Sequence, residues 1–111
     1  GGLDDILDWE REGEPSYRAM AAPKRLAFFE KAGHYGFSIL CDVIPGFKPE
    51  CGGLEDGFED LDLIHRLTNT WVTAHLGEIM LGDERYSPWL ESSTADEYEE
   101  ITLQQTRDEM P

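Results

Sequence analysis

One short apolar run constrains the fold of this chain more than any other feature. Residues 24–30, Lys-Arg-Leu-Ala-Phe-Phe-Glu, combine apolar side chains with charged ends, a pattern typical of a strand buried on both faces of a parallel sheet. No other part of the 111 residues predicts a strand as clearly. Because the backbone groups of a lone strand need neighbours, this run predicts a sheet whose other strands the chain lacks.

Two helices are expected on either side of that strand. Good helix formers follow a proline at 15–22, and Pro23 stops the segment. Farther along, apolar residues recur every three or four positions over 60–81, which predicts a helix of about six turns with Asp60 as its N-cap. Between the strand and this helix, the Gly- and Pro-rich segment 45–57 predicts a loop.

The last segment differs in composition from the rest. Residues 91–111 are acidic, with only a few apolar side chains among them, and this composition predicts a marginal helix or disorder. The chain is therefore expected to consist of a folded segment, 1–90, and an acidic tail, 91–111.

The charge balance argues against several partners. Nine basic and 24 acidic residues give a net charge of -15, which repels phosphate backbones and anionic membranes, so nucleic acid is not expected. No apolar run approaches the roughly 20 residues of a membrane span. No cofactor is expected, and two cysteines without paired histidines supply too few ligands for a metal site. His65 and His75 lie too far apart on the predicted helix for a ligand pair, and we expect them to be solvated or packed.

The two cysteines bear on the compartment of the protein. Cys41 and Cys51 lie in or beside the Gly- and Pro-rich loop, where a disulfide would close a short surface loop. Such a bridge would favour secretion. Two independent thiols are the alternative, and the localisation stays open.

Two motifs carry groups suited to acid–base chemistry. Gly-Gly-Leu-Asp-Asp-Ile occupies residues 1–6, and Ala-Gly-His follows the predicted strand at 32–34. Reactive groups of open parallel sheets lie in loops at the carboxyl ends of strands, so His34 is expected to face a cleft. It could accept and return a proton if a carboxylate oriented it. Asp4 is the candidate carboxylate, Asp5 is its rival, and a purely structural role is the alternative for His34.

The order of these motifs resembles the C-terminal portion of α/β-hydrolases, in which the nucleophile, the acid and the histidine follow one another along the chain. The resemblance implies an α/β fold: the C-terminal part of a parallel-sheet hydrolase domain, with one strand, a long closing helix and an acidic tail. Serine esterases, lipases and dienelactone-hydrolase-like members are the most similar. By the same resemblance Asp4 is the triad acid and His34 the general base of a carboxylic ester hydrolase that acts through an acyl-enzyme.

The nucleophile of that family is missing from this chain. No serine stands in the Gly-x-Ser-x-Gly motif that the family uses; the five are Ser16, Ser38, Ser87, Ser92 and Ser93. The chain is therefore expected to be inactive alone, with a small ester or acyl compound as substrate and the nucleophile on a second chain or on upstream sequence. The alternative function is a small acidic interaction module that binds a basic protein partner through its charge.

Overall fold

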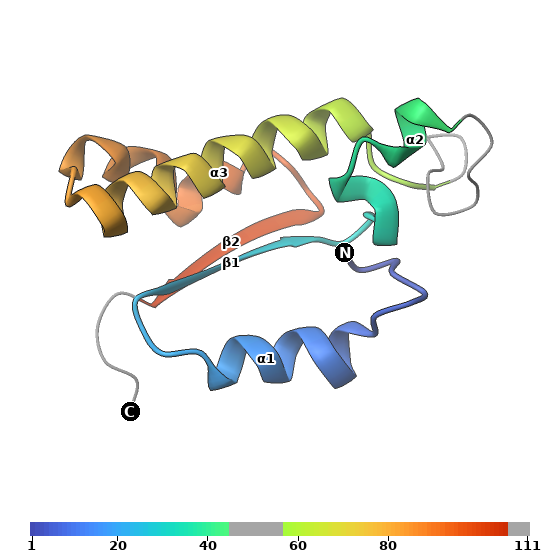
Figure 1. Ribbon diagram of the computed structural model, residues 1–111, viewed down its shortest axis with the longest axis horizontal. Coiled ribbons are helices and arrows are strands. Elements are labelled where there is room, and N and C mark those ends of the chain that lie inside the picture. The colour runs from blue at the N-terminus through green and yellow to red at the C-terminus, as the bar shows by residue number, and fades with distance from the viewer. Residues whose placement is uncertain (45–56, 107–111) are drawn as a thin grey trace.

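A two-stranded antiparallel sheet lies between two helices in the computed structural model, which describes residues 1–44 and 57–106 (Figure 1). Cys51 falls outside these residues, and with it the expected disulfide. The helices and strands, in chain order, are α1 (Glu14–Ala19), β1 (Lys24–Phe29), α2 (Leu40–Val43), α3 (Leu61–Leu81) and β2 (Ile101–Thr106). A π-helical turn at Trp9–Gly13 leads into α1, and 3₁₀ turns occupy His34–Phe37, Glu84–Leu90 and Ser92–Ala95.

The pairing of the two strands corrects the expected fold class. β1 and β2 run antiparallel, with Lys24 opposite Thr106 and Phe29 opposite Ile101. The prediction of a C-terminal part of an α/β-hydrolase parallel sheet is wrong, because the sheet of the described residues is this single antiparallel pair. The strand predicted at 24–30 is present, but its neighbour is supplied by this same chain.

That neighbour comes from the segment expected to be a marginal helix or disordered. Residues 92–95 form a short 3₁₀ turn, but 101–106 form β2, so the expectation of a marginal helix or disorder was wrong over 101–106. The sequence of β2, Ile-Thr-Leu-Gln-Gln-Thr, places Ile101 and Leu103 on one face, and both are buried. The β-branched residues and the alternation of this short run suit a half-buried strand.

Both faces of β1 are covered, because successive side chains of a strand point to opposite sides. On one side Phe29 packs against Trp71 of α3, with ring centroids 6.0 Å apart. On the other side Phe28 packs against Trp9 of the π-helical turn before α1, at 4.9 Å. Figure 1 shows α3 and α1 on opposite sides of the sheet.

The main core lies between the sheet and α3. Its buried residues come from both strands, from α3 and from the turns at 32 and 95: they are Phe29, Ala32, Ile64, Leu67, Trp71, Ala95, Ile101 and Leu103. Burial of these apolar side chains is the main favourable contribution to folding. Since β2 supplies two of them, the C-terminal strand is part of the core.

The limits of α3 follow its local signals, and the prediction of a helix at 60–81 is confirmed. The Asp60 carboxylate accepts a hydrogen bond from the backbone N–H of Leu63 and caps the first turn. At the other end Gly82 adopts a left-handed conformation, with φ of 63°, which glycine reaches without steric cost.

α1 is attached to β1 by a buried lysine. The helix ends at Ala19 because Met20 turns to an extended conformation, earlier than the predicted end at Ala22. Lys24 is only 2% exposed, and its Nζ donates to the carbonyl oxygens of Tyr17 (2.8 Å) and Arg18 (3.3 Å). The Tyr17 carbonyl also accepts the backbone N–H of Met20, so the ammonium group adds a second donor there and supplies one to the Arg18 carbonyl at the end of α1.

Candidate acid–base site

The structure brings the two candidate catalytic side chains together. Nδ1 of His34 lies 3.0 Å from Oδ2 and 3.2 Å from Oδ1 of Asp4. The side chain of Asp4 is 11% exposed and that of His34 is 27% exposed, so the pair sits at the edge of the interior. Asp5, the rival for the acid position, is exposed.

The Asp4 carboxylate is held by the backbone that follows it. Its Oδ1 accepts hydrogen bonds from the N–H groups of Ile6 and Leu7, both at 2.8 Å. A short acidic side chain suits this local turn, because it can bond the backbone two and three residues on. With Oδ1 bound to these donors, Oδ2 is directed at the imidazole.

Two glycines allow this segment to lie directly against the end of β1. Gly2 N–H donates to the carbonyl of Phe29 at 2.8 Å, and Leu3 N–H donates to that of Ala32 at 3.0 Å. A Cβ atom on Gly1 would overlap the Ala32 carbonyl, and one on Gly2 would overlap the Glu30 carbonyl. The Gly-Gly pair therefore permits the close approach that carries Asp4 to His34.

His34 opens a tight turn directly after β1. It is the first residue of the 3₁₀ turn His34–Phe37, in which Gly36 N–H donates to the Gly33 carbonyl at 3.3 Å. Gly36 is buried, and its α-carbon faces Ile64 of α3. The ring of Tyr35 meets the imidazole edge-on, with centroids 4.9 Å apart. Packing against α3 thus fixes the backbone that carries the histidine.

The electrostatics favour an ionised Asp4. Burial opposes ionisation, but hydrogen bonds from Leu7, from His34 and from Ile6, together with the charge of His34, hold the pKa of the Asp4 carboxyl below its ordinary value. An ionised carboxylate can only accept hydrogen bonds, so Nδ1 of His34 must be the donor. In the neutral imidazole Nε2 then carries the lone pair and is the basic atom.

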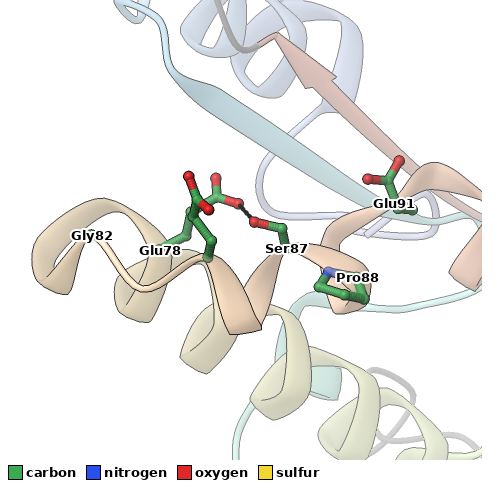
Figure 2. A pocket seen from close by; sticks show the side chains of 6 residues that line it. Glu78, Gly82, Ser87, Pro88 and Glu91 are labelled. Atoms are coloured by element: carbon green, nitrogen blue, oxygen red, sulfur yellow. Dashed lines mark hydrogen bonds between the residues drawn. The ribbon is translucent and has the colours of Figure 1, made fainter.

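Two serine hydroxyls, those of Ser38 and Ser87, donate hydrogen bonds to groups other than His34. Ser38 donates its hydroxyl to the carbonyl oxygen of Tyr35 at 3.0 Å. Ser87 donates to Oε2 of Glu78 at 2.6 Å, beside a cavity of about 740 Å³ at the C-terminal end of α3 (Figure 2). Neither hydroxyl is therefore directed at His34 as a nucleophile.

A polar network that joins β1 to α3 was not foreseen. Arg25 bonds both His75, through Nη1 and Nδ1 at 2.8 Å, and Glu78, through Nη2 and Oε1 at 2.7 Å. The Arg25 side chain is buried, with 6% of its surface exposed. The sequence separates Arg25 from its partners by fifty residues or more, so only the short spacing of His75 and Glu78 on one helix hinted at a cluster.

Over residues 1–44 and 57–106, no group of three or more His, Cys, Asp or Glu side chains is arranged to hold a metal ion. Among the helices of the same residues, none has both the length and the apolar character of a membrane span.

Comparison of the chain with models of known protein families, with curated proteins and with solved structures finds no match. The resemblance to α/β-hydrolases thus rests on motif order alone, and the catalytic roles of Asp4 and His34 stay predictions.

Proposed function

We propose that this chain supplies the acid and the histidine of a nucleophile–histidine–acid triad that cleaves carboxylic esters. The observation that carries the proposal is the Asp4 carboxylate on Nδ1 of His34, which leaves Nε2 as the basic atom of the neutral ring. The nucleophilic hydroxyl comes from outside these 111 residues, on a second chain or on upstream sequence.

Each step moves one proton at Nε2. As the nucleophilic oxygen attacks the ester carbonyl carbon, Nε2 of His34 takes its proton, and the Asp4 carboxylate stabilises the resulting imidazolium. When the bond to the leaving alcohol breaks, Nε2 returns the proton to the alcohol oxygen. A water molecule then attacks the acyl group by the same proton transfers, which releases the carboxylic acid and regenerates the nucleophile.

A binding module is the second candidate function. It is supported by the net charge of -15 and by the antiparallel pairing of β1 with β2, which gives the chain a core without strands from elsewhere. Cooperative unfolding of the isolated chain would favour a self-contained module. Aggregation or a molten state would favour a chain that needs further strands.

An alcohol added to the solvent can stand in for the missing nucleophile. In buffer containing methanol, the chain should accelerate methanolysis of p-nitrophenyl acetate, measured as methyl acetate formed. General acid–base catalysis contributes about 10²- to 10⁴-fold, so His34→Ala and Asp4→Asn should each lose at least about tenfold of the rate. His65→Ala is the matched control and should retain it.

A second measurement reads the orientation of the ring directly. The ¹⁵N chemical shifts of His34 should show the proton on Nδ1 in the wild-type chain and on Nε2 in Asp4→Asn, because the amide presents a donor to Nδ1. Equal methanolysis by wild type and His34→Ala, or an unchanged tautomer in Asp4→Asn, would overturn the proposal.

A further inference from the structure

One edge of β1 is open. β1 pairs with β2 along its other edge, where Glu30 N–H also donates to the carbonyl of Glu100. The Phe29 carbonyl instead accepts from Gly2, on the edge away from β2. Alternate residues of an antiparallel strand point their backbone groups the same way, so those of Ala27 and Arg25 also face this open edge. No strand of the described chain, 1–44 and 57–106, pairs with them.

A cavity lies on each face of this edge. On the α1 side a cavity of about 790 Å³ has apolar walls from Leu7, Trp9, Leu26 and Phe28, among other residues. On the α3 side a cavity of about 220 Å³ is walled by Trp71, Val72, Leu76, Leu90 and Leu103, among others. Arg25 and Ala27 belong to the walls of both cavities. We call the open edge at these two residues, with the two cavities, the β1 slot.

Several large apolar side chains around the slot are exposed. Leu7 and Met20 on the α1 side, and Val72 and Leu76 on α3, each expose about half of their surface. Exposed apolar residues that gather beside unpaired strand groups are typical of a protein-binding surface. A strand entering the slot would satisfy the backbone groups of Ala27 and Arg25 and bury these side chains at once.

We infer that the β1 slot binds an extended segment of a partner protein that has apolar side chains on both faces and basic residues at its ends. Strand addition supplies backbone hydrogen bonds, and the two cavities receive alternate side chains of the added strand. We expect basic residues at the ends of the bound segment because the protein is acidic. The segment 4–18, which contributes Asp4, Glu12 and Arg11 to the wall of the larger cavity, carries six acidic side chains against two arginines, in a chain of net charge -15. Arg25, which also lines this cavity, is paired with Glu78, so the acidic residues around the slot attract basic residues at the ends of a bound segment.

The inference does not rest on the proposed acid–base chemistry. Asp4 lines the larger cavity, so a docked segment would lie beside the Asp4–His34 pair. Binding to the backbone edge nevertheless needs no proton transfer, and His34→Ala, which removes the proposed base and lines neither cavity, should still bind. The two proposals can therefore fail separately.

The test uses the chain and a short synthetic peptide with a central run of valine and threonine and lysines at both ends. Calorimetry should show binding, and the amides of Arg25 and Ala27 should become protected from hydrogen exchange. A matched peptide, N-methylated at alternate residues, cannot form the backbone bonds and should bind at least about tenfold more weakly. A peptide with glutamates in place of the lysines should bind more weakly than the lysine peptide, and this difference in affinity should shrink as the salt concentration rises.

A variant of the chain tests the same edge. Ala27→Pro removes an outward-facing N–H and leaves the ladder to β2 intact, a position where an edge strand tolerates proline. It should lose about tenfold in peptide affinity while its circular dichroism stays unchanged. If this variant does not fold, the N-methylated peptide decides alone. The inference would be overturned if the lysine peptide did not bind, or if it and its N-methylated match bound equally well. It would also be overturned by a dimer of the chain that Ala27→Pro dissociates, because the occupant of the slot would then be a second copy.

Discussion

Arg25 donates a hydrogen bond from Nη1 to Nδ1 of His75, across 2.8 Å between β1 and α3. A guanidinium has no acceptor, so Nδ1 must carry a lone pair and the folded chain holds His75 as the neutral Nε2–H tautomer. Burial lowers the pKa of His75 and the charge of Arg25 lowers it further, against the opposing effect of Glu78. Protonation of this imidazole therefore opposes folding.

The first prediction concerns the pH dependence of stability. The folded chain binds this proton more weakly than the unfolded chain, so the contribution of His75 is complete above its ordinary pKa of 6.5 and is lost as pH falls through the lower folded value. Urea denaturation should show the free energy of unfolding decreasing below that pH. His75→Gln keeps an acceptor for Arg25 without titrating and should flatten this dependence, whereas His65→Gln should not. An equal slope in both variants would contradict the assignment.

The second prediction separates two roles of Asp4. Asp4→Asn retains an oxygen for the N–H groups of Ile6 and Leu7, whereas Asp4→Ala leaves both donors without it. Removing the side-chain acceptor of a helix N-cap costs about 1 kcal/mol, and we expect the alanine variant to be less stable than the asparagine variant by about the same amount. Chemical denaturation near neutral pH measures the difference, and equal stabilities would show that the carboxylate does not hold this turn.

Ionisation of Asp4 adds a third prediction, in acid. Because its folded pKa lies below the ordinary 3.8, the ionised carboxylate contributes stability that is complete above that value and is lost as pH falls through the folded pKa. Wild type should therefore lose more stability in this acidic range than Asp4→Asn, which carries no titrating group there. Denaturation curves at several acidic pH values test this, and parallel losses in the two proteins would count against it.

The fourth prediction concerns the close approach at the start of the chain. Gly2→Ala would drive a Cβ into the Glu30 carbonyl, so the backbone must shift, at a cost of about 1–3 kcal/mol, and Asp4 should move away from His34. Gly36→Ala is the control, because its Cβ would meet Ile64 and Ala32 at ordinary contact distances of 3.6 and 3.7 Å. Thermal denaturation reports the stability, and the ¹⁵N shifts of His34 report the contact. Equal stabilities and equal His34 shifts in the two variants would show that the close approach at Gly2 does not position Asp4.

The fifth prediction tests whether β2 belongs to the core. Leu103 is 4% exposed and packs in the main core, so Leu103→Ala should destabilise the chain by about 2–5 kcal/mol. The neighbouring Thr102 is exposed on the opposite face, and Thr102→Ala should change stability by no more than about 0.5 kcal/mol. Equal effects in urea denaturation would mean that this strand is not docked.

Local signals predicted their elements well. α3 has an apolar period, an N-cap at Asp60 and a glycine at 82, and all three act within a few residues of the helix ends. β1 was predicted from the apolar run with charged ends at its own residues. β2 was missed because the acidic residues before it dominated the composition of the segment, and because the register between Phe29 and Ile101 is a non-local property. The parallel sheet was an inference from motif order, which carries no information about strand direction.

The candidate site was predicted in part. The order of the Asp and His motifs led to the expectation that Asp4 and His34 would meet, and the distance between them is 3.0 Å. The donors that hold Asp4 are backbone N–H groups of Ile6 and Leu7, which leave no mark in residue types. The contact between Arg25 and His75 joins two elements whose packing the sequence alone did not define.

The pairing of β1 with β2 also determines when this protein can first fold during its own synthesis. Translation is vectorial, so Phe29 leaves the ribosome well before its partner Ile101 exists. Until Ile101 is synthesised, β1 has apolar side chains and no partner strand. An exposed segment of this kind can bind a chaperone or aggregate. The dependence of the core on a late strand makes the interval between these two events the period in which the nascent chain is most vulnerable.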